Sequence, residues 1–449
     1  MRNRSLTLTI ATCVAWIALI GAAPVLPPSS FQTAAMERLP NGTTIVSQPT
    51  GGALVAVEVV VPVGLAQQTA ANAGIAGVAA QLVLSTPIDG GATLADAAAA
   101  VGATVTYTLD PLDTRFYLEA QAPQFGHLLH GLVTAINAPD LRGFSAARAA
   151  ALASASTAGD GPAIAALDML RQVTYAGTGY SYPDAGRQIS LSKLTASDAS
   201  TFASSYRTGP STIVALEGAV DSAVMSTVRS EFGKVATPGG RVRLFSSATN
   251  AQPTTKAQPP STRGHEVVTH RAVSAPWVAV GYPAPGMYAS DYPVMLVIEA
   301  LLGRGGDVHS FSLGSANSLP DEFAGAYYQF EAQPGMLAIF LNGSDTSVDT
   351  AVRDLQSAVN RLRSTTLSDA IVDHGRRLAV GQYFASVSTL GDAAWLLGRS
   401  AASPDGPNFE NLVPVRIARV SAADIQRVAR HYLTGEILGI VLPQTSTQQ

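Results

Sequence analysis

Two pairs of histidines have a spacing that could hold a metal ion. His127 and His130 are three residues apart, which would place both imidazoles on one face of a helix. No acid or third histidine accompanies them in the sequence, so we interpret them as helix-surface residues. His265 and His270 enclose the segment His-Glu-Val-Val-Thr-His, one residue longer than the His-Glu-x-x-His zinc signature. This segment alternates like a strand, which sends residues five apart to opposite faces, so we predict no metal site there.

Other catalytic patterns are also lacking. The single cysteine, Cys13, lies in the apolar N-terminal segment, so a protein without that segment has no thiol for disulfides, thiolate–zinc sites or cysteine catalysis. The glycines at Gly303, Gly305 and Gly306 do not form the Gly-x-x-x-x-Gly-Lys-Ser/Thr phosphate loop and are typical of a helix end. From these residues alone we therefore expect no cofactor and no metal.

The N-terminus is typical of an export signal. Arg2 and Arg4 precede an apolar stretch from Leu6 to Ile20, and small residues follow at 21–23. We predict a signal peptide over residues 1–23, with an uncleaved membrane anchor as the alternative. The protein is then expected to be exported, either periplasmic or secreted, and in the alternative case anchored in the membrane by this segment.

Composition excludes some partners. The chain has 449 residues, a net charge of −4 and no basic stripe, so nucleic acid is not expected as a partner. It is 47% hydrophobic, yet no run of eighteen apolar residues follows the N-terminal segment. We therefore expect no membrane contact beyond the signal or anchor.

A polar segment divides the chain. Residues 245–264 are rich in Ser, Thr, Pro and Gln and lack hydrophobic periodicity, as in an extended linker. The linker separates a predicted N-terminal lobe at 31–244 from a predicted C-terminal lobe at 265–443, each of plausible domain size.

The two halves show the same order of predicted elements, with strands clustered before runs of helices. Strands are predicted at 43–47, 53–63, 104–109 and 114–120, and again at 265–271, 276–282, 324–331 and 336–342. Helices are predicted at 73–84, 125–136 and 163–173, and again at 292–302, 348–362 and 422–432. This order predicts an α+β fold with two homologous lobes, each a β-sheet with helices packed on one face.

Four segments together resemble the insulinase/pitrilysin-type zinc peptidases, also called inverzincins. They are the Leu-Pro-Asn-Gly turn, strand and helix at 39–87, the helix and two strands at 94–120, the strand and helix at 209–233, and the strand, Pro-x-Pro-Gly turn and helix at 278–306. The resemblance covers roughly residues 31–442 and implies a two-lobed, processing-peptidase-like member of that family.

The resemblance also implies where zinc ligands would stand. The family places His-x-x-Glu-His on the first helix, and the corresponding residues here are Gly77, Ala80 and Gln81. The family's distal glutamate would fall near residues 151–157, which are Ala-Leu-Ala-Ser-Ala-Ser-Thr. Glycine and alanine offer no ligand and a glutamine amide is a weak one, so we expect a degenerate zinc motif.

The family's non-catalytic chains carry an arginine and a tyrosine that anchor the substrate. Tyr328 matches the tyrosine, and His309 stands at or near the arginine, where it replaces a permanent charge with a titratable one. Both are candidate substrate-binding residues. For Tyr328 the alternative is a tyrosine packed on the sheet.

The resemblance implies a catalytically inactive peptidase homologue rather than an enzyme. We expect the non-catalytic subunit of a heterodimeric complex, with a zinc-bearing sibling peptidase as partner and an extended peptide as substrate. The alternatives are a scaffold or binding protein without a protease partner, and an unconventional hydrolase with an unrecognised site.

Overall fold

The computed structural model describes residues 34–88, 91–157, 161–234, 265–303, 323–331, 334–342 and 347–444. The predicted signal segment, the predicted linker and His309 lie outside these residues. The described residues belong to one compact unit.

The first half builds a six-stranded sheet, sheet 1, in the order β1-β2-β6-β3-β5-β4. The strands are β1 Ala35–Arg38, β2 Thr44–Pro49, β3 Leu54–Val61, β4 Thr104–Leu109, β5 Thr114–Gln121 and β6 Ile213–Gly218. β2 and β6 are parallel, whereas β3 runs antiparallel to both β5 and β6. β1 and β4 are the edges of this sheet.

The second half repeats the plan in a five-stranded sheet, sheet 2, in the order β7-β11-β8-β10-β9. The strands are β7 His265–Arg271, β8 Trp277–Ala284, β9 Phe323–Gln329, β10 Gly335–Asn342 and β11 Ile437–Pro443. β7 and β11 are parallel, and β8 runs antiparallel to β10 and β11, as their counterparts do in sheet 1. The predicted α+β fold with two similar lobes is confirmed.

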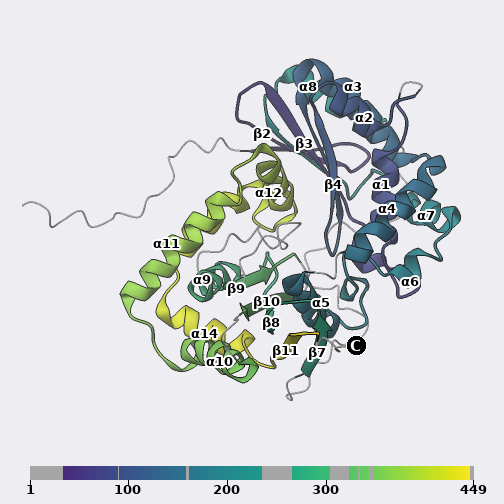
Figure 1. Ribbon diagram of the computed structural model, residues 1–449. Coiled ribbons are helices and arrows are strands. Elements are labelled where there is room, and N and C mark those ends of the chain that lie inside the picture. The colour runs from purple at the N-terminus through teal and green to yellow at the C-terminus, as the bar shows by residue number, and fades with distance from the viewer. Residues whose placement is uncertain are drawn as a thin grey trace, which may run out of the picture. The chain divides into compact units, whose positions relative to one another are not determined.

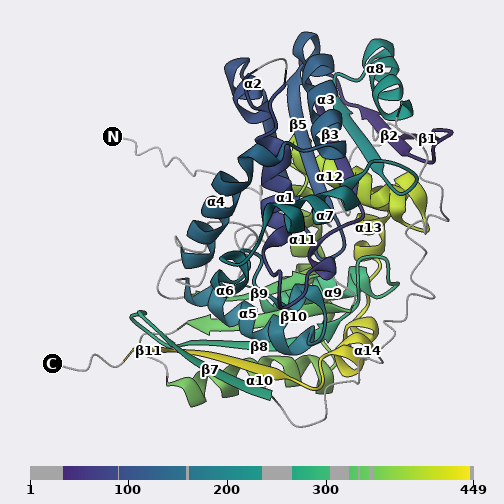
Figure 2. The ribbon, with the colours of Figure 1, turned by 90° about the vertical axis from the view of Figure 1, so that its right-hand side faces the viewer.

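Helices flank both sheets (Figures 1 and 2). Those before residue 235 are α1 Ile75–Leu84, α2 Leu94–Ala100, α3 Ala122–Asn137, α4 Phe144–Thr157, α5 Pro162–Thr174, α6 Gln188–Leu191, α7 Ala196–Ala203 and α8 Ser222–Gly233. Those after residue 264 are α9 Tyr292–Leu302, α10 Val348–Ser364, α11 Asp369–Ala385, α12 Leu390–Ala402, α13 Phe409–Ala418 and α14 Ala422–Tyr432. Within the described residues, none of the helices is both long enough and apolar enough to cross a membrane.

Alternating strand residues give each sheet two buried faces. On β3 of sheet 1, Val57 and Val59 pack in a core shared with α1 and α3, whereas Val60 packs on the opposite side with Leu397 of α12. On β8 of sheet 2, Val280 packs with α9 and α14, whereas Ala279 belongs to the core that contains α5. Period-two alternation therefore places apolar side chains on both sides of each sheet. The expectation of helices on one face is corrected here, because helices cover both faces.

The second face of each sheet is covered by a helix from the other half of the chain. Helix α5 precedes the linker but contacts β8 and β11 of sheet 2. Helix α12 follows the linker but contacts β2, β3 and β6 of sheet 1. Figure 1 shows α12 beside the strands of sheet 1, and Figure 2 shows α5 across sheet 2. The two halves are thus joined by a reciprocal exchange of helices.

The predicted Asn-Gly turn begins the N-terminal half. Gly42 has φ +90°, a conformation that favours glycine, and a Cβ there would lie 2.7 Å from Cα of Pro210. The Asn41 amide nitrogen donates to the carbonyl of Phe232 at 2.6 Å, which ties this turn to the end of α8.

Candidate functional site

The residues predicted to form a degenerate zinc motif lie on α1, beside the edge strand β4. Gly77 and Gln81 are half-buried, and Ala80 is fully buried in the core. The Tyr107 hydroxyl of β4 is 3.4 Å from the Gly77 carbonyl, to which it donates, and a Cβ at Gly77 would lie 3.7 Å from Leu109. The side of α1 at Gly77 is therefore packed against β4.

These residues do not fit a zinc ion. Position 77 has no side chain, the methyl group at 80 is buried among apolar residues, and position 81 offers an amide. The segment 151–157 belongs to α4, which packs on α1, and it presents alanines and small hydroxyl residues instead of a carboxylate. Across the described ranges, no group of three or more His, Cys, Asp or Glu side chains is arranged to hold a metal ion.

The first histidine pair does have an acid nearby, contrary to the expectation from sequence. His130 Nδ1 on α3 is 2.8 Å from Glu231 Oε2 on α8, and the His130 side chain is 60% exposed. Sequence missed this partner because the two residues are 101 positions apart. The exposed position agrees with the interpretation of a helix-surface histidine. The second pair, His265 and His270, lies on strand β7 as predicted.

Tyr328, the predicted substrate-binding tyrosine, lies in the core of the second half. It is 1% exposed, and its hydroxyl donates to the Pro285 carbonyl at 2.5 Å. Its backbone N–H donates to Oε1 of Glu299 at 3.0 Å. In this conformation Tyr328 is packed on the sheet, and a contact with substrate stays a prediction.

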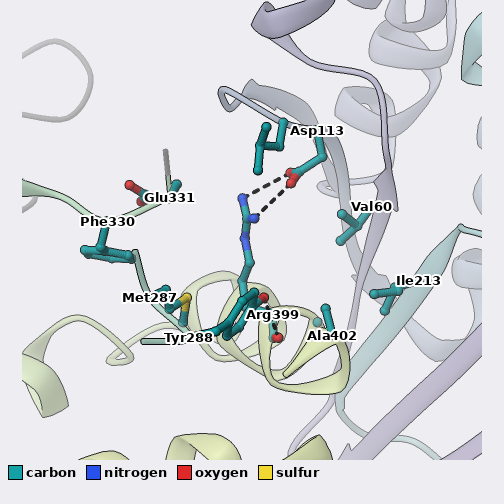
Figure 3. Close-up of a pocket in the computed structure, with 11 residues that line it drawn as sticks. Val60, Asp113, Ile213, Met287, Tyr288, Phe330, Glu331, Arg399 and Ala402 are labelled. Carbon is teal, nitrogen blue, oxygen red and sulfur yellow. Dashed lines mark hydrogen bonds and ion pairs between the residues drawn. The ribbon is translucent and has the colours of Figure 1, made fainter. Parts of the chain in front are cut away.

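A pocket opens where sheet 1, α12 and the loops after β8 and β9 meet (Figure 3). It encloses about 430 Å³ of space between atoms, part of it open to solvent. Its wall combines apolar and ionisable side chains from both halves: Val60, Leu112, Asp113, Ile213, Met287, Tyr288, Phe330, Glu331, Gly398, Arg399 and Ala402. This pocket is the place where the two halves contribute charged groups to one site.

Arg399 is the central residue of the pocket. Its Nη2 atom is 2.6 Å from Asp110 Oδ2, and its Nη1 atom is 2.8 Å from Asp113 Oδ2. Asp110 and Asp113 lie in the tight loop between β4 and β5, and Arg399 lies on α12. Figure 3 shows the Arg399 side chain extending from its helix to Asp113. A buried arginine paired with two carboxylates thus links the exchanged helix to sheet 1.

A second arginine extends the cluster. Arg115 on β5 lies 2.7 Å from Asp110 Oδ2 and 2.8 Å from Glu58 Oε1, and its guanidinium stands 5.4 Å from the ring centre of Trp395 on α12. Burial raises the pKa of Glu58 in spite of Arg115. Glu58 and Arg115 lie on the face of sheet 1 that α12 covers, so this polar pair is sealed by the exchanged helix.

The cluster holds more carboxyl groups than guanidinium groups, and their pKa values reflect this. Burial raises the pKa of Asp113 to about 7, against the opposing effect of Arg399. Burial and the neighbouring Asp110 raise the pKa of Glu331 to about 7. Burial also opposes ionisation of Asp110, but Arg115 and Arg399 together lower its pKa. Asp110 is therefore the carboxyl group that stays ionised, and its negative charge lies between the two positively charged arginines.

Glycines bring α12 close to sheet 1. A Cβ at Gly391 would lie 3.2 Å from the Tyr117 ring, and a Cβ at Gly398 would lie 3.4 Å from Ala215 and from Val60. Gly391, Gly398 and Arg399 fall on one face of the helix because they are seven and eight residues apart. This close approach lets the Arg399 side chain reach the β4–β5 loop.

Part of the chain matches one known protein family, and the fold matches several solved structures. Residues 193–378 match the family described as "Peptidase M16 inactive domain". A comparison with curated proteins gives no match.

The fold is shared with several solved structures of low sequence identity. A protease from Helicobacter pylori has a TM-score of 0.78 and 17% identity, over 91% of this chain and 99% of that one. A peptidase M16 inactive domain from Pseudomonas fluorescens has a TM-score of 0.74 and 12% identity, over 93% and 99%. A chain of complex III2 from Candida albicans has a TM-score of 0.69 and 13% identity, over 91% and 95%.

Proposed function

Because residues 193–378 match the inactive-domain family of M16 peptidases and the described chain has the fold of M16-like peptidases, we propose that this protein is the non-catalytic subunit of a peptidase complex. The predicted insulinase-type resemblance is confirmed at the level of family and fold. The observation that carries the proposal is that helix α1 is formed, but has Gly77, Ala80 and Gln81 at the positions where the active family has His, Glu and His.

In this proposal the protein helps to enclose an extended peptide, and a zinc-bearing sibling supplies the catalytic chemistry. The edge strand β4 is the surface best placed to hold the peptide, because it has one strand neighbour, β5, and lies against α1. An extended peptide could add to this edge through main-chain hydrogen bonds. Binding there would place the peptide beside the position that carries zinc in the active family.

The test is a zinc and activity assay on the chain without residues 1–23, alone and together with a zinc-bearing sibling from the same organism. We expect no bound zinc and no cleavage by the chain alone, and activity gained or enhanced in the mixture. Stoichiometric zinc and chelator-sensitive cleavage by the chain alone would contradict the proposal.

Hydrogen exchange can locate the peptide. Amides of residues 104–109 should exchange more slowly when an unstructured peptide is bound, because added main-chain hydrogen bonds protect them. Protection confined to another edge strand would place the peptide elsewhere, and no binding at all would remove the peptide-enclosing role.

A scaffold role without a protease partner is the second candidate. The observation in its favour is the shared fold with a chain of complex III2, a multi-subunit assembly. Purification of the native complex distinguishes the two, because a zinc-bearing peptidase should co-purify in the first case and not in the second.

We also propose that the protein is exported, which fractionation of cells with an antibody against the chain would test.

A further inference from the structure

A second cavity lies within the C-terminal half, between α9, α11 and α12. It encloses about 500 Å³ of space between atoms, including open solvent. Phe330 lines both this cavity and the pocket at Arg399, so the two are neighbours. The features that matter are four aromatic rings, one buried carboxyl group and one unsatisfied N–H group.

Aromatic side chains from four segments line the cavity. They are Tyr292 on α9, Phe330 after β9, Tyr383 on α11 and Trp395 on α12. The ring centres of Tyr292 and Phe330 are 5.4 Å apart, and those of Phe330 and Trp395 are 6.2 Å apart. Rings that surround a small space can stabilise a cation through their electron-rich faces.

Glu299 supplies a carboxyl group to the same cavity. It is 3% exposed, and its Oε1 atom accepts a hydrogen bond from the Tyr328 N–H at 3.0 Å. Among the residues that the structure describes, no Lys, Arg or His forms an ion pair with it, in contrast to Asp110 and Asp113. Burial, aided by Glu331, raises the pKa of Glu299 to about 8, as expected for a carboxyl group without a counter-ion.

Trp395 adds a donor that has no acceptor. The residue is 8% exposed, and its indole Nε1 is buried without a hydrogen-bond partner in the described part of the chain. A buried N–H without an acceptor is unfavourable, and a ligand oxygen would satisfy it. Arg115, which stands over the same indole, does not line the cavity.

From this combination we propose that the cavity binds an alkylammonium group, namely the lysine side chain of a peptide, with Glu299 as counter-ion and the aromatic rings as its cage. The Trp395 N–H donates to a carbonyl oxygen of the same lysine residue. This inference rests on the proposed peptide-binding role and adds a preference for lysine. It also explains why the Glu299 carboxyl group is buried among aromatic rings without a basic partner in the described part of the chain.

The test uses a pair of small probes that differ in the ammonium group. Nα-acetyl-lysine N-methylamide carries it, and Nα-acetyl-norleucine N-methylamide has an uncharged side chain. Binding is followed by the indole N–H resonances of the protein, which has three tryptophans. A Trp395→Phe variant assigns the resonance of interest.

We expect saturable movement of the Trp395 resonance with the lysine probe and at least about tenfold weaker binding of the norleucine probe, a difference of about 1.4 kcal/mol. Glu299→Gln keeps an oxygen for the Tyr328 N–H but cannot ionise to balance a bound ammonium group, and it should weaken lysine binding by a similar factor. Glu410→Gln, at a carboxyl group that does not line the cavity, is the matched control and should leave binding unchanged.

Equal affinity for the two probes, unchanged affinity in Glu299→Gln, or no movement of the Trp395 resonance at millimolar probe would overturn the proposal. Failure of this proposal is distinguishable from failure of the peptide-binding role. If only the lysine preference is wrong, peptides with and without lysine will bind equally well. If the lysine probe binds in a Glu299-dependent manner but no peptide binds, the cavity assignment stands and the peptide-binding role falls.

Discussion

Replacing Arg399 by methionine removes the guanidinium that links the two halves while keeping a long unbranched side chain. In the native protein this group contacts Asp110 and Asp113 at 2.6 and 2.8 Å, and its side chain is 8% exposed. Asp110 keeps Arg115 as a partner at 2.7 Å, whereas the contacts of Asp113 with Arg399 are lost. The variant therefore leaves one buried carboxyl group without its cation.

Removing one partner of a buried pair costs about 3–5 kcal/mol of unfolding free energy. Because Arg115 still pairs with Asp110, we expect a loss at the lower end, about 3 kcal/mol. The loss should depend on pH. The pKa of Asp113 is raised to about 7 in the folded protein, so its favourable protonated state is present at low pH and lost as pH rises through 7. Without Arg399 this pKa rises further, so the variant should be more destabilised at pH 8 than at pH 5.5.

Urea denaturation followed by circular dichroism at both pH values gives the two losses. The double variant Arg399→Met/Asp113→Asn should lose less than the two single variants combined, by at least about 1 kcal/mol. Arg142→Met, in an ion pair whose arginine side chain is 84% exposed, is the control and should leave the urea midpoint unchanged. A loss below about 1 kcal/mol that is equal at both pH values would refute the reasoning.

Three further changes test the packing and the degenerate motif. Gly398→Leu forces side-chain atoms between α12 and sheet 1 and should cost about 1–3 kcal/mol of unfolding free energy, measured by urea denaturation. Tyr328→Phe leaves a buried carbonyl without its donor and should cost about 1–2 kcal/mol; a change in peptide affinity without a loss of stability would instead indicate a substrate contact. Restoring the motif with Gly77→His, Ala80→Glu and Gln81→His should not give stoichiometric zinc by elemental analysis, because residues 151–157 supply no carboxylate; full zinc occupancy would show that another residue completes the site.

Much of the fold was predictable because apolar periodicity is a local property. The strands at 104–109 and 265–271 and the helices at 292–302 and 422–432 were predicted with the bounds observed. The strand at 53–63 and the helix at 73–84 differ from β3 and α1 by one or two residues at an end. The similar opening of the two halves in sequence corresponds to two sheets that share the order of five strands, with β1 added at the edge of sheet 1.

The exchange of helices could not be predicted from the same signal. The helix at 163–173 was expected to cover the sheet of its own half, and it lies on sheet 2 as α5. Helix α12 was not among the predicted elements. Periodicity shows that a helix has an apolar side but does not say which sheet that side contacts.

The charged cluster was missed for a related reason. Asp110 and Arg399 are 289 positions apart, so nothing local in the sequence pairs them. The signal available in the sequence was an arginine within the apolar run Trp395–Ala402, since a charged residue is rarely buried unless it is paired. That signal indicates that a partner exists without identifying it.

The exchange of α5 and α12 has a consequence for the continuity of the backbone. Each half carries a helix that completes the other half's core, and the buried Arg399–Asp110 pair adds a polar contact between them. A single proteolytic cut within residues 245–264 should therefore leave two fragments that remain bound to each other and elute together under native conditions. Only a denaturant would separate them, so an intact elution profile is not proof of an intact chain.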